Sequence, residues 1–110
     1  MVDTVVSVVT AGLSFLGIML EKDIVKQIKT YLKGIPSCFC FKEHGGPYGQ
    51  TGLPDIIVCL SGRFIALEVK TETGKTTALQ ELTLKEIRKA GGIAEVVRSV
   101  GEVKALVEKL

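Results

Sequence analysis

The segment 55-DIIVCLSGRFIALEVK-70 decides the fold of this 110-residue chain. Two mostly apolar runs, residues 55–60 and 63–70, flank the dipeptide Ser61-Gly62, which is typical of a two-residue β-hairpin turn. We therefore expect two neighbouring antiparallel strands. If residue 60 faces residue 63 across the turn, counting outward along both strands brings Asp55 opposite Glu68.

The same hairpin predicts a small charged site. Side chains alternate along a strand, so Glu68 and Lys70 share one face, with Asp55 about 5 Å from Glu68 between Cβ atoms. Two acids this close repel each other unless a cation lies between them, and hard divalent ions such as Mg²⁺ prefer carboxylates. Lys70 could then orient a water or stabilise developing negative charge. The alternative is a turn aspartate beside a solvated strand edge.

The flanking sequence completes an α/β pattern. A helix is expected over residues 20–33 from the spacing of Ile24, Ile28 and Leu32, and Gly34 ends it. The helix is followed by a strand over 37–43 and a glycine-rich loop over 44–53. After the hairpin we expect a helix over 77–90, a strand over 93–98 and a terminal helix. Ser99 begins that last helix, with capping-box spacing to Glu102. The order is αβββαβα. The helix between the third and fourth strands requires a crossover, so the central sheet is mixed, with a parallel part, and flanked by helices.

Composition limits the classes of protein. The chain is long enough for one domain, and 46% hydrophobic with 24% charged residues is typical of a globular chain. A net charge of +2 excludes a histone-like protein, and the low aromatic content argues against a platform that stacks single-stranded bases. Three cysteines, an odd number, argue against a disulfide framework and for a reducing, cytoplasmic compartment.

Residues 1–18 are an apolar extension with Asp3 as the only charge. We expect Met19 to be the natural start and residues 19–110 to form the domain. The run from Val2 to Leu20 just reaches the length of a membrane span, but glycines and clustered valines interrupt a helix there. A membrane-bound protein is therefore the less favoured interpretation.

Several of these residues carry a family resemblance. Gly52-Leu53-Pro54-Asp55 followed by Glu68-Val69-Lys70 resembles the PD-(D/E)XK nuclease signature. With His44-Gly45-Gly46, Gly74, Gln80 and Gly91-Gly92, residues 20–107 resemble the VRR-NUC family, and most closely its short, stand-alone bacteriophage members. The resemblance implies a restriction-endonuclease-like fold and metal-dependent hydrolysis of DNA phosphodiesters.

The resemblance also implies roles for individual residues. Asp55 and Glu68 would ligate Mg²⁺ or Mn²⁺, with the Val69 carbonyl and Glu21 as further ligands. Lys70 would be the catalytic lysine. Stand-alone members are similar to Holliday junction resolvases and act as dimers, which implies branched DNA as substrate, a homodimer and, for a phage protein, the host cytoplasm. A catalytically silent nucleic-acid-binding module on the same fold is the leading alternative.

Two of the proposed site residues have a second interpretation. The spacing of Glu21 to the apolar stripe of its helix makes it lean toward the buried side, but a carboxylate in the first turn is also favoured by the helix dipole. Gln80, which the resemblance places near the scissile phosphate, shares a face with Leu84, yet Thr77 and Gln80 also have capping-box spacing.

The sequence gives weaker indications of contact surfaces. Lys42, His44 and Lys75 are expected to contact the DNA backbone. Leu79 and Leu82 point away from the face of Gln80, and exposed apolar side chains there suggest a surface for a second subunit.

Overall fold

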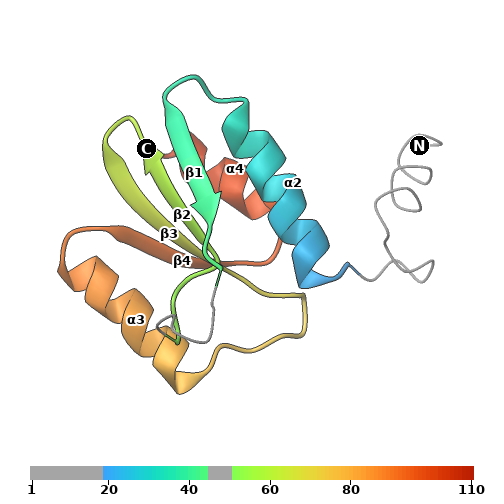
Figure 1. The fold of residues 1–110 in the computed structure, drawn as a ribbon, viewed down its shortest axis with the longest axis vertical. Coiled ribbons are helices and arrows are strands. Elements are labelled where there is room, and N and C mark those ends of the chain that lie inside the picture. Colours follow the sequence, from blue (N-terminus) through green and yellow to red (C-terminus); the bar gives the residue numbers. More distant parts are fainter. Residues whose placement is uncertain (1–18, 45–50) are drawn as a thin grey trace.

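The computed structural model describes residues 19–44 and 51–110 and contains the predicted order of elements (Figure 1). A first helix and a meander of three strands lead through a crossover helix to a fourth strand and a last helix. The elements are α2 (Glu21–Lys33), β1 (Cys38–Lys42), β2 (Ile56–Leu60), β3 (Arg63–Val69), α3 (Ala78–Lys89), β4 (Ile93–Val97) and α4 (Val100–Glu108).

The four strands form one mixed sheet in the order β1-β2-β3-β4. β1, β2 and β3 pair antiparallel, and β4 lies parallel to β3, as the crossover helix requires. Ile56 pairs with Leu67 and Leu60 with Arg63, so the predicted hairpin register is confirmed. Asp55 therefore approaches Glu68 at the end of the hairpin.

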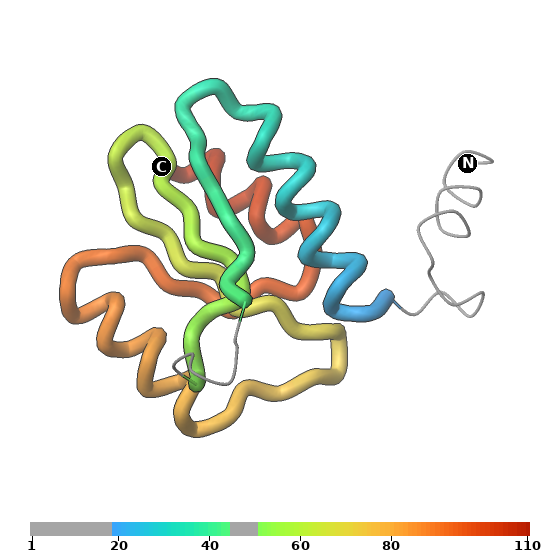
Figure 2. The backbone as a smooth tube through the Cα atoms, in the orientation of Figure 1, coloured from blue at the N-terminus to red at the C-terminus, as the bar shows by residue number. Residues whose placement is uncertain are grey.

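Helices cover the two faces of the sheet unequally (Figures 1 and 2). α2 and α4 pack on the face that carries Ile65, Leu67 and Val69, and this side holds most of the core. α3 covers the other face over β3 and β4, where Leu84 packs against Ala66 and Ala94. β3 is therefore buried on both sides, which explains its almost continuous apolar sequence.

Local sequence explains the turns and helix starts. Ser61 and Gly62 both have positive φ, 50° and 83°, as a type I′ hairpin turn requires. Thr77 caps α3 in a complete capping box with Gln80. The capping box expected at Ser99 is only half formed, because the Glu102 carboxylate accepts from the Arg98 N–H, one residue before the cap.

The two strands of the hairpin are each one residue shorter than predicted. Asp55 precedes β2 and Lys70 follows β3. The reason is that the Asp55 side chain, not a strand backbone, accepts the Val69 N–H, while the Lys70 N–H donates to the Val97 carbonyl. Both residues thus lie where regular pairing of β2 with β3 ends.

The predicted extension over 1–18 and most of the glycine-rich loop lie outside the described residues. Within residues 19–44 and 51–110, no helix is long and apolar enough to cross a membrane. The three cysteines are free thiols in the structure.

Candidate active site

Asp55 is held rigidly at the end of the hairpin. Its Oδ2 accepts a hydrogen bond of 2.7 Å from the Val69 N–H, and its carbonyl accepts one of 2.8 Å from the Glu43 N–H. Pro54, directly before it, is fully buried. These two bonds connect Asp55 to the end of β3 and to the residue after β1. The other carboxylate oxygen, Oδ1, does not take part in the bond with Val69.

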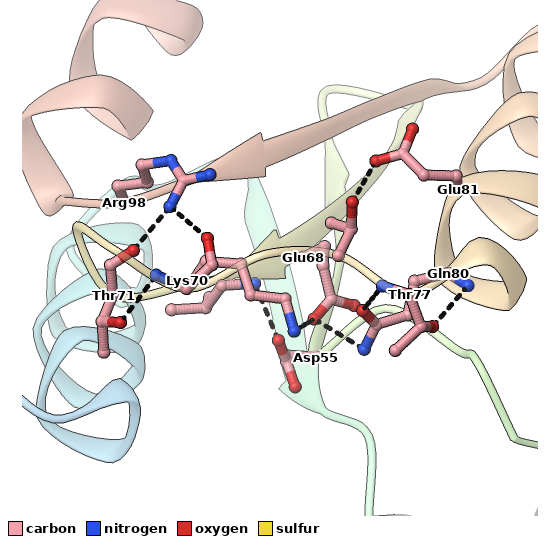
Figure 3. Close-up of polar contacts among 11 residues, drawn as sticks. Asp55, Glu68, Lys70, Thr71, Thr77, Gln80, Glu81 and Arg98 are labelled. Carbon is pink, nitrogen blue, oxygen red and sulfur yellow. Dashed lines mark hydrogen bonds and ion pairs between the residues drawn. The ribbon is translucent and has the colours of Figure 1, made fainter.

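Glu68 is a carboxyl group inside the protein, with only 2% of its surface exposed. Its Oε2 lies 3.5 Å from the Lys70 Nζ and 3.3 Å from the Gln80 Nε2 (Figure 3). Its Oε1 is buried and has no hydrogen-bond partner among the described residues. A buried carboxylate oxygen without a partner is costly, unless an ion or water completes it.

Burial and the neighbouring Asp55 raise the pKa of Glu68 from 4.5 to about 8, and Lys70 only partly opposes this. Without a cation, Glu68 therefore holds a proton at neutral pH. A divalent cation between the two acids would favour the ionised form and give the orphaned Oε1 a partner. The donor set of Asp55 and Glu68 thus fits a hard divalent ion, although no three His, Cys, Asp or Glu side chains gather around a common point in the described part of the chain.

Gln80 completes the predicted capping box with Thr77 and also contacts Glu68, while its place near a scissile phosphate stays a prediction. Its Oε1 accepts from the Thr77 N–H at 2.9 Å, and its backbone N–H donates to the Thr77 hydroxyl at 3.1 Å. The same side chain donates from Nε2 to Glu68. One glutamine therefore starts α3 and also fixes the buried carboxyl group.

Glu21 is placed differently from the expectation. It lies at the first residue of α2 and is exposed, so the prediction that it leans toward the buried side of the helix was wrong. Asp23 is buried instead. Glu21 makes no hydrogen bond or ion pair with Asp55, Glu68 or Lys70 within residues 19–44 and 51–110, so its part in the site stays a prediction.

The other predicted contact residues lie around the same end of the sheet. Lys42 ends β1 and pairs with Ile56, the residue after Asp55. His44 is exposed just beyond β1, and Lys75 is exposed in the loop between β3 and α3. The structure thus distributes them around the carboxyl pair without joining them to it.

Arg98 is a residue that the sequence reading missed. Its Nη1 donates to the carbonyls of Thr71, Glu72 and Gly74 at 2.6, 3.4 and 2.7 Å. These carbonyls belong to the loop that directly follows Lys70 (Figure 3). Arg98 therefore holds the loop that leaves the site, and the only sequence signal for it is a charged residue directly after an apolar strand.

Two solved structures are similar to this chain in fold. Scans of the sequence against family models and against curated proteins gave no match. A solved structure described as "VRR_NUC domain" superposes with a TM-score of 0.68 at 29% identity, covering 80% of this chain and 94% of that one. The chain is therefore similar to VRR-NUC domains in fold and, at 29% identity, in sequence. A second structure, a "VRR_NUC domain protein" at 15% identity, shares the fold with a TM-score of 0.68 over 83% of this chain and 87% of its own.

This similarity to VRR-NUC domains agrees with the α/β fold expected from the sequence. The mixed four-stranded sheet and its helices are those of a nuclease family. Four predicted site residues meet at one end of the sheet: Lys70 and Gln80 contact Glu68, and Asp55 accepts from the Val69 N–H beside it.

Proposed function

We propose that this protein is a metal-dependent DNA endonuclease that hydrolyses phosphodiester bonds. One observation carries the proposal: a buried carboxyl group, Glu68, lies beside Asp55 and Lys70 with one oxygen that has no partner among the described residues. A purely structural carboxylate would be expected to have both oxygens satisfied. Carboxyl groups with strongly raised pKa values are common at functional sites.

The proposed roles combine the contacts at the site with the family resemblance. Asp55 and Glu68 would hold Mg²⁺ or Mn²⁺, with the Val69 carbonyl and Glu21, directly or through water, as further ligands. A bound divalent ion would polarise the scissile phosphate and lower the pKa of an attacking water. Lys70, whose side chain is largely buried beside Glu68, supplies positive charge for the negative charge that develops on the phosphate. Gln80 orients Glu68 and is close enough to the pair to contact the phosphate.

We further propose branched DNA as the substrate, in the manner of a Holliday junction resolvase, and a homodimer as the active form. Lys42, His44 and Lys75 would contact the DNA backbone. Exposed apolar side chains support the dimer: Leu79 and Leu82 of α3 are 45% and 50% exposed, as the sequence predicted. A two-fold dimer would present two active sites to two strands.

Beside α3, the sheet adds aromatic side chains to this apolar surface. Phe39 is 69% exposed, its ring centroid lies 6.2 Å from that of Phe41, and Phe64 is also exposed. Phe39 pairs with Cys59 and Cys59 with Phe64 in the sheet register, so these side chains share the face that α3 leaves open. Burying them against a second copy would remove apolar area from water.

A catalytically silent DNA-binding module is the second candidate. The exposed position of Glu21 and the lack of a third acid near the pair, within the part of the chain that the structure describes, favour it. In that case the fold would bind DNA but the carboxyl pair would not support hydrolysis.

A cleavage assay separates the two candidates. Purified protein is mixed with a four-way junction, a flap, a linear duplex and a single strand, in Mg²⁺, Mn²⁺ or EDTA. We expect cutting that needs metal, that is fastest on the junction and that falls by about 10²-fold or more in Lys70→Ala. Lys109→Ala, an exposed lysine at the end of α4, is the control and should cut normally.

Two results would count against the nuclease. DNA binding without cutting on any substrate would favour the silent module. Cutting in EDTA, or unchanged cutting by Lys70→Ala, would mean that this site is not where the reaction occurs.

The free thiols and the DNA substrate support a cytoplasmic protein, in the host cell if the chain is of the bacteriophage type. Fractionation of cells that express the full-length chain would test this, since a protein held by residues 2–20 would sediment with membranes.

A further inference from the structure

A lysine groove lies on the opposite side of the sheet from the Glu68 face. Four lysines of α2, Lys22, Lys26, Lys29 and Lys33, line a depression of about 300 Å³ together with Lys42 of β1. No acidic side chain lines it. Within residues 19–44 and 51–110 the single contact of a basic side chain with a carboxyl group closer than 4 Å is that of Lys70 with Glu68, so these five ammonium groups have no carboxylate partner there.

The lysines of α2 are arranged at a cost to the helix. Their spacing of four, three and four residues places them on one stripe, where like charges three or four residues apart destabilise a helix. A polyanion would relieve this repulsion. Because a helix rises 1.5 Å per residue, Lys22 and Lys33 are about 16 Å apart, a length that spans about five phosphates of one DNA strand along its axis.

The groove begins near the active site and leads away from it. Lys42 is the last residue of β1 and pairs with Ile56, next to Asp55. β1 returns antiparallel to the direction of α2, so Lys33 lies toward the start of β1, at the far end of the sheet (Figure 1). DNA that enters the groove beside Asp55 would therefore run along α2 toward the hairpin end.

The groove and the buried carboxyl group belong to different faces. α2 covers the face of Ile65 and Leu67, whereas Glu68 shares the opposite face with Ala66 and meets Gln80 of α3. A straight duplex lying on the α3 side does not also follow α2. A branched DNA can do both, with one arm at the carboxyl pair and another along the lysines.

We infer that the lysine groove binds the phosphate backbone of a second arm of a branched DNA substrate. The inference rests on the proposed function for its substrate and adds the surface that distinguishes branched from linear DNA. Phosphate contacts of this kind carry no sequence preference, so the groove would recognise the position of an arm and not its bases.

The test compares two matched double variants. Lys29→Gln with Lys33→Gln removes two charges from the far half of the groove. Lys85→Gln with Lys89→Gln removes two exposed lysines with the same four-residue spacing from α3. Binding to a four-way junction and to a linear duplex of the same arm sequence is measured in EDTA at several salt concentrations, so that no cleavage occurs.

We expect the groove variant to bind the junction about tenfold or more weakly, with a salt slope smaller by about 2, while its binding to linear duplex is unchanged. The α3 variant should keep the wild-type ratio of junction to duplex affinity. Thermal melting of both variants checks the fold, and loss of lysine repulsion should leave the groove variant at least as stable as the wild type.

Other outcomes overturn the inference. An equal loss on both DNAs would make the lysines a general electrostatic surface, and an unchanged salt slope would mean that they do not touch phosphate. Cleavage is scored separately on the wild type. If the protein does not cut but the groove variant loses its preference for the junction, the nuclease fails and the groove stands. If it cuts and the preference is unchanged, the groove fails alone.

Discussion

Replacement of Gln80 by alanine tests how the site is assembled. Gln80→Ala removes the 2.9 Å bond from the Thr77 N–H to Oε1 and the 3.3 Å bond from Nε2 to Glu68. Loss of the capping bond costs about 1 kcal/mol. The bond to Glu68 contributes about 1 kcal/mol while that carboxyl group is neutral and about 2 kcal/mol when it is ionised.

The pKa of Glu68, about 8, makes this loss depend on pH. In metal-free protein we expect Gln80→Ala to lower the free energy of unfolding by about 2 kcal/mol at pH 6 and by about 3 kcal/mol at pH 9. Urea denaturation in EDTA at the two pH values measures both numbers.

Thr77→Ala is the matched control for Gln80→Ala. It removes the hydroxyl that accepts the Gln80 N–H at 3.1 Å but leaves the bond to Glu68. We expect a loss of about 1 kcal/mol at both pH values. If Gln80→Ala lost the same free energy at both pH values, or if Thr77→Ala showed the same increase with pH, the bond from Gln80 to a titrating Glu68 would be refuted.

Three more predictions follow from the same contacts. In metal-free protein, Glu68 binds its proton more tightly in the folded than in the unfolded chain, so the free energy of unfolding should fall as pH rises from about 4.5 to about 8. Urea titrations should show that Glu68→Gln lacks this fall, and a rise in wild-type stability over the same pH range would contradict the prediction. Gly52→Ala should lower the free energy of unfolding by about 1 kcal/mol more than Gly62→Ala, as measured by thermal melts. Both glycines have positive φ, but only at Gly52 would an added Cβ lie 2.6 Å from the Leu79 Cγ. Equal losses would argue against that contact. Arg98→Ala should speed amide exchange in residues 71–74 about tenfold, because it removes the Nη1 that donates to the carbonyls of Thr71 and Gly74. Unchanged exchange would show that Arg98 does not hold this loop.

The parts of the site that local sequence controls could be predicted. The Ser61-Gly62 turn fixes the register of the hairpin, and the register alone brings Asp55 to Glu68. The capping box of Gln80 with Thr77 was predicted correctly, and the side chain also contacts Glu68, because it has a donor and an acceptor and uses them in different directions.

The parts that depend on distant neighbours could not. Arg98 binds carbonyls 24 to 27 residues earlier in the chain, which no local pattern indicates. Periodicity placed Glu21 near the apolar stripe of α2, but at the first residue of a helix the packing of other elements decides exposure, and there Asp23 is the buried acid. The sequence indicates that the lysines of α2 lie on a polar face of the helix. It does not indicate that Lys42 of β1 completes a groove with them.

The central claim is that Asp55 and Glu68 share a divalent cation, and a Mn²⁺ titration tests it most directly. Binding is followed by electron paramagnetic resonance for the wild type, Asp55→Asn, Glu68→Gln and the control Glu72→Gln, which alters an exposed acid in the adjacent loop. We predict one site that weakens at least tenfold in the first two variants and is unchanged in the control. Wild-type Mn²⁺ affinity in both Asp55→Asn and Glu68→Gln would contradict the account.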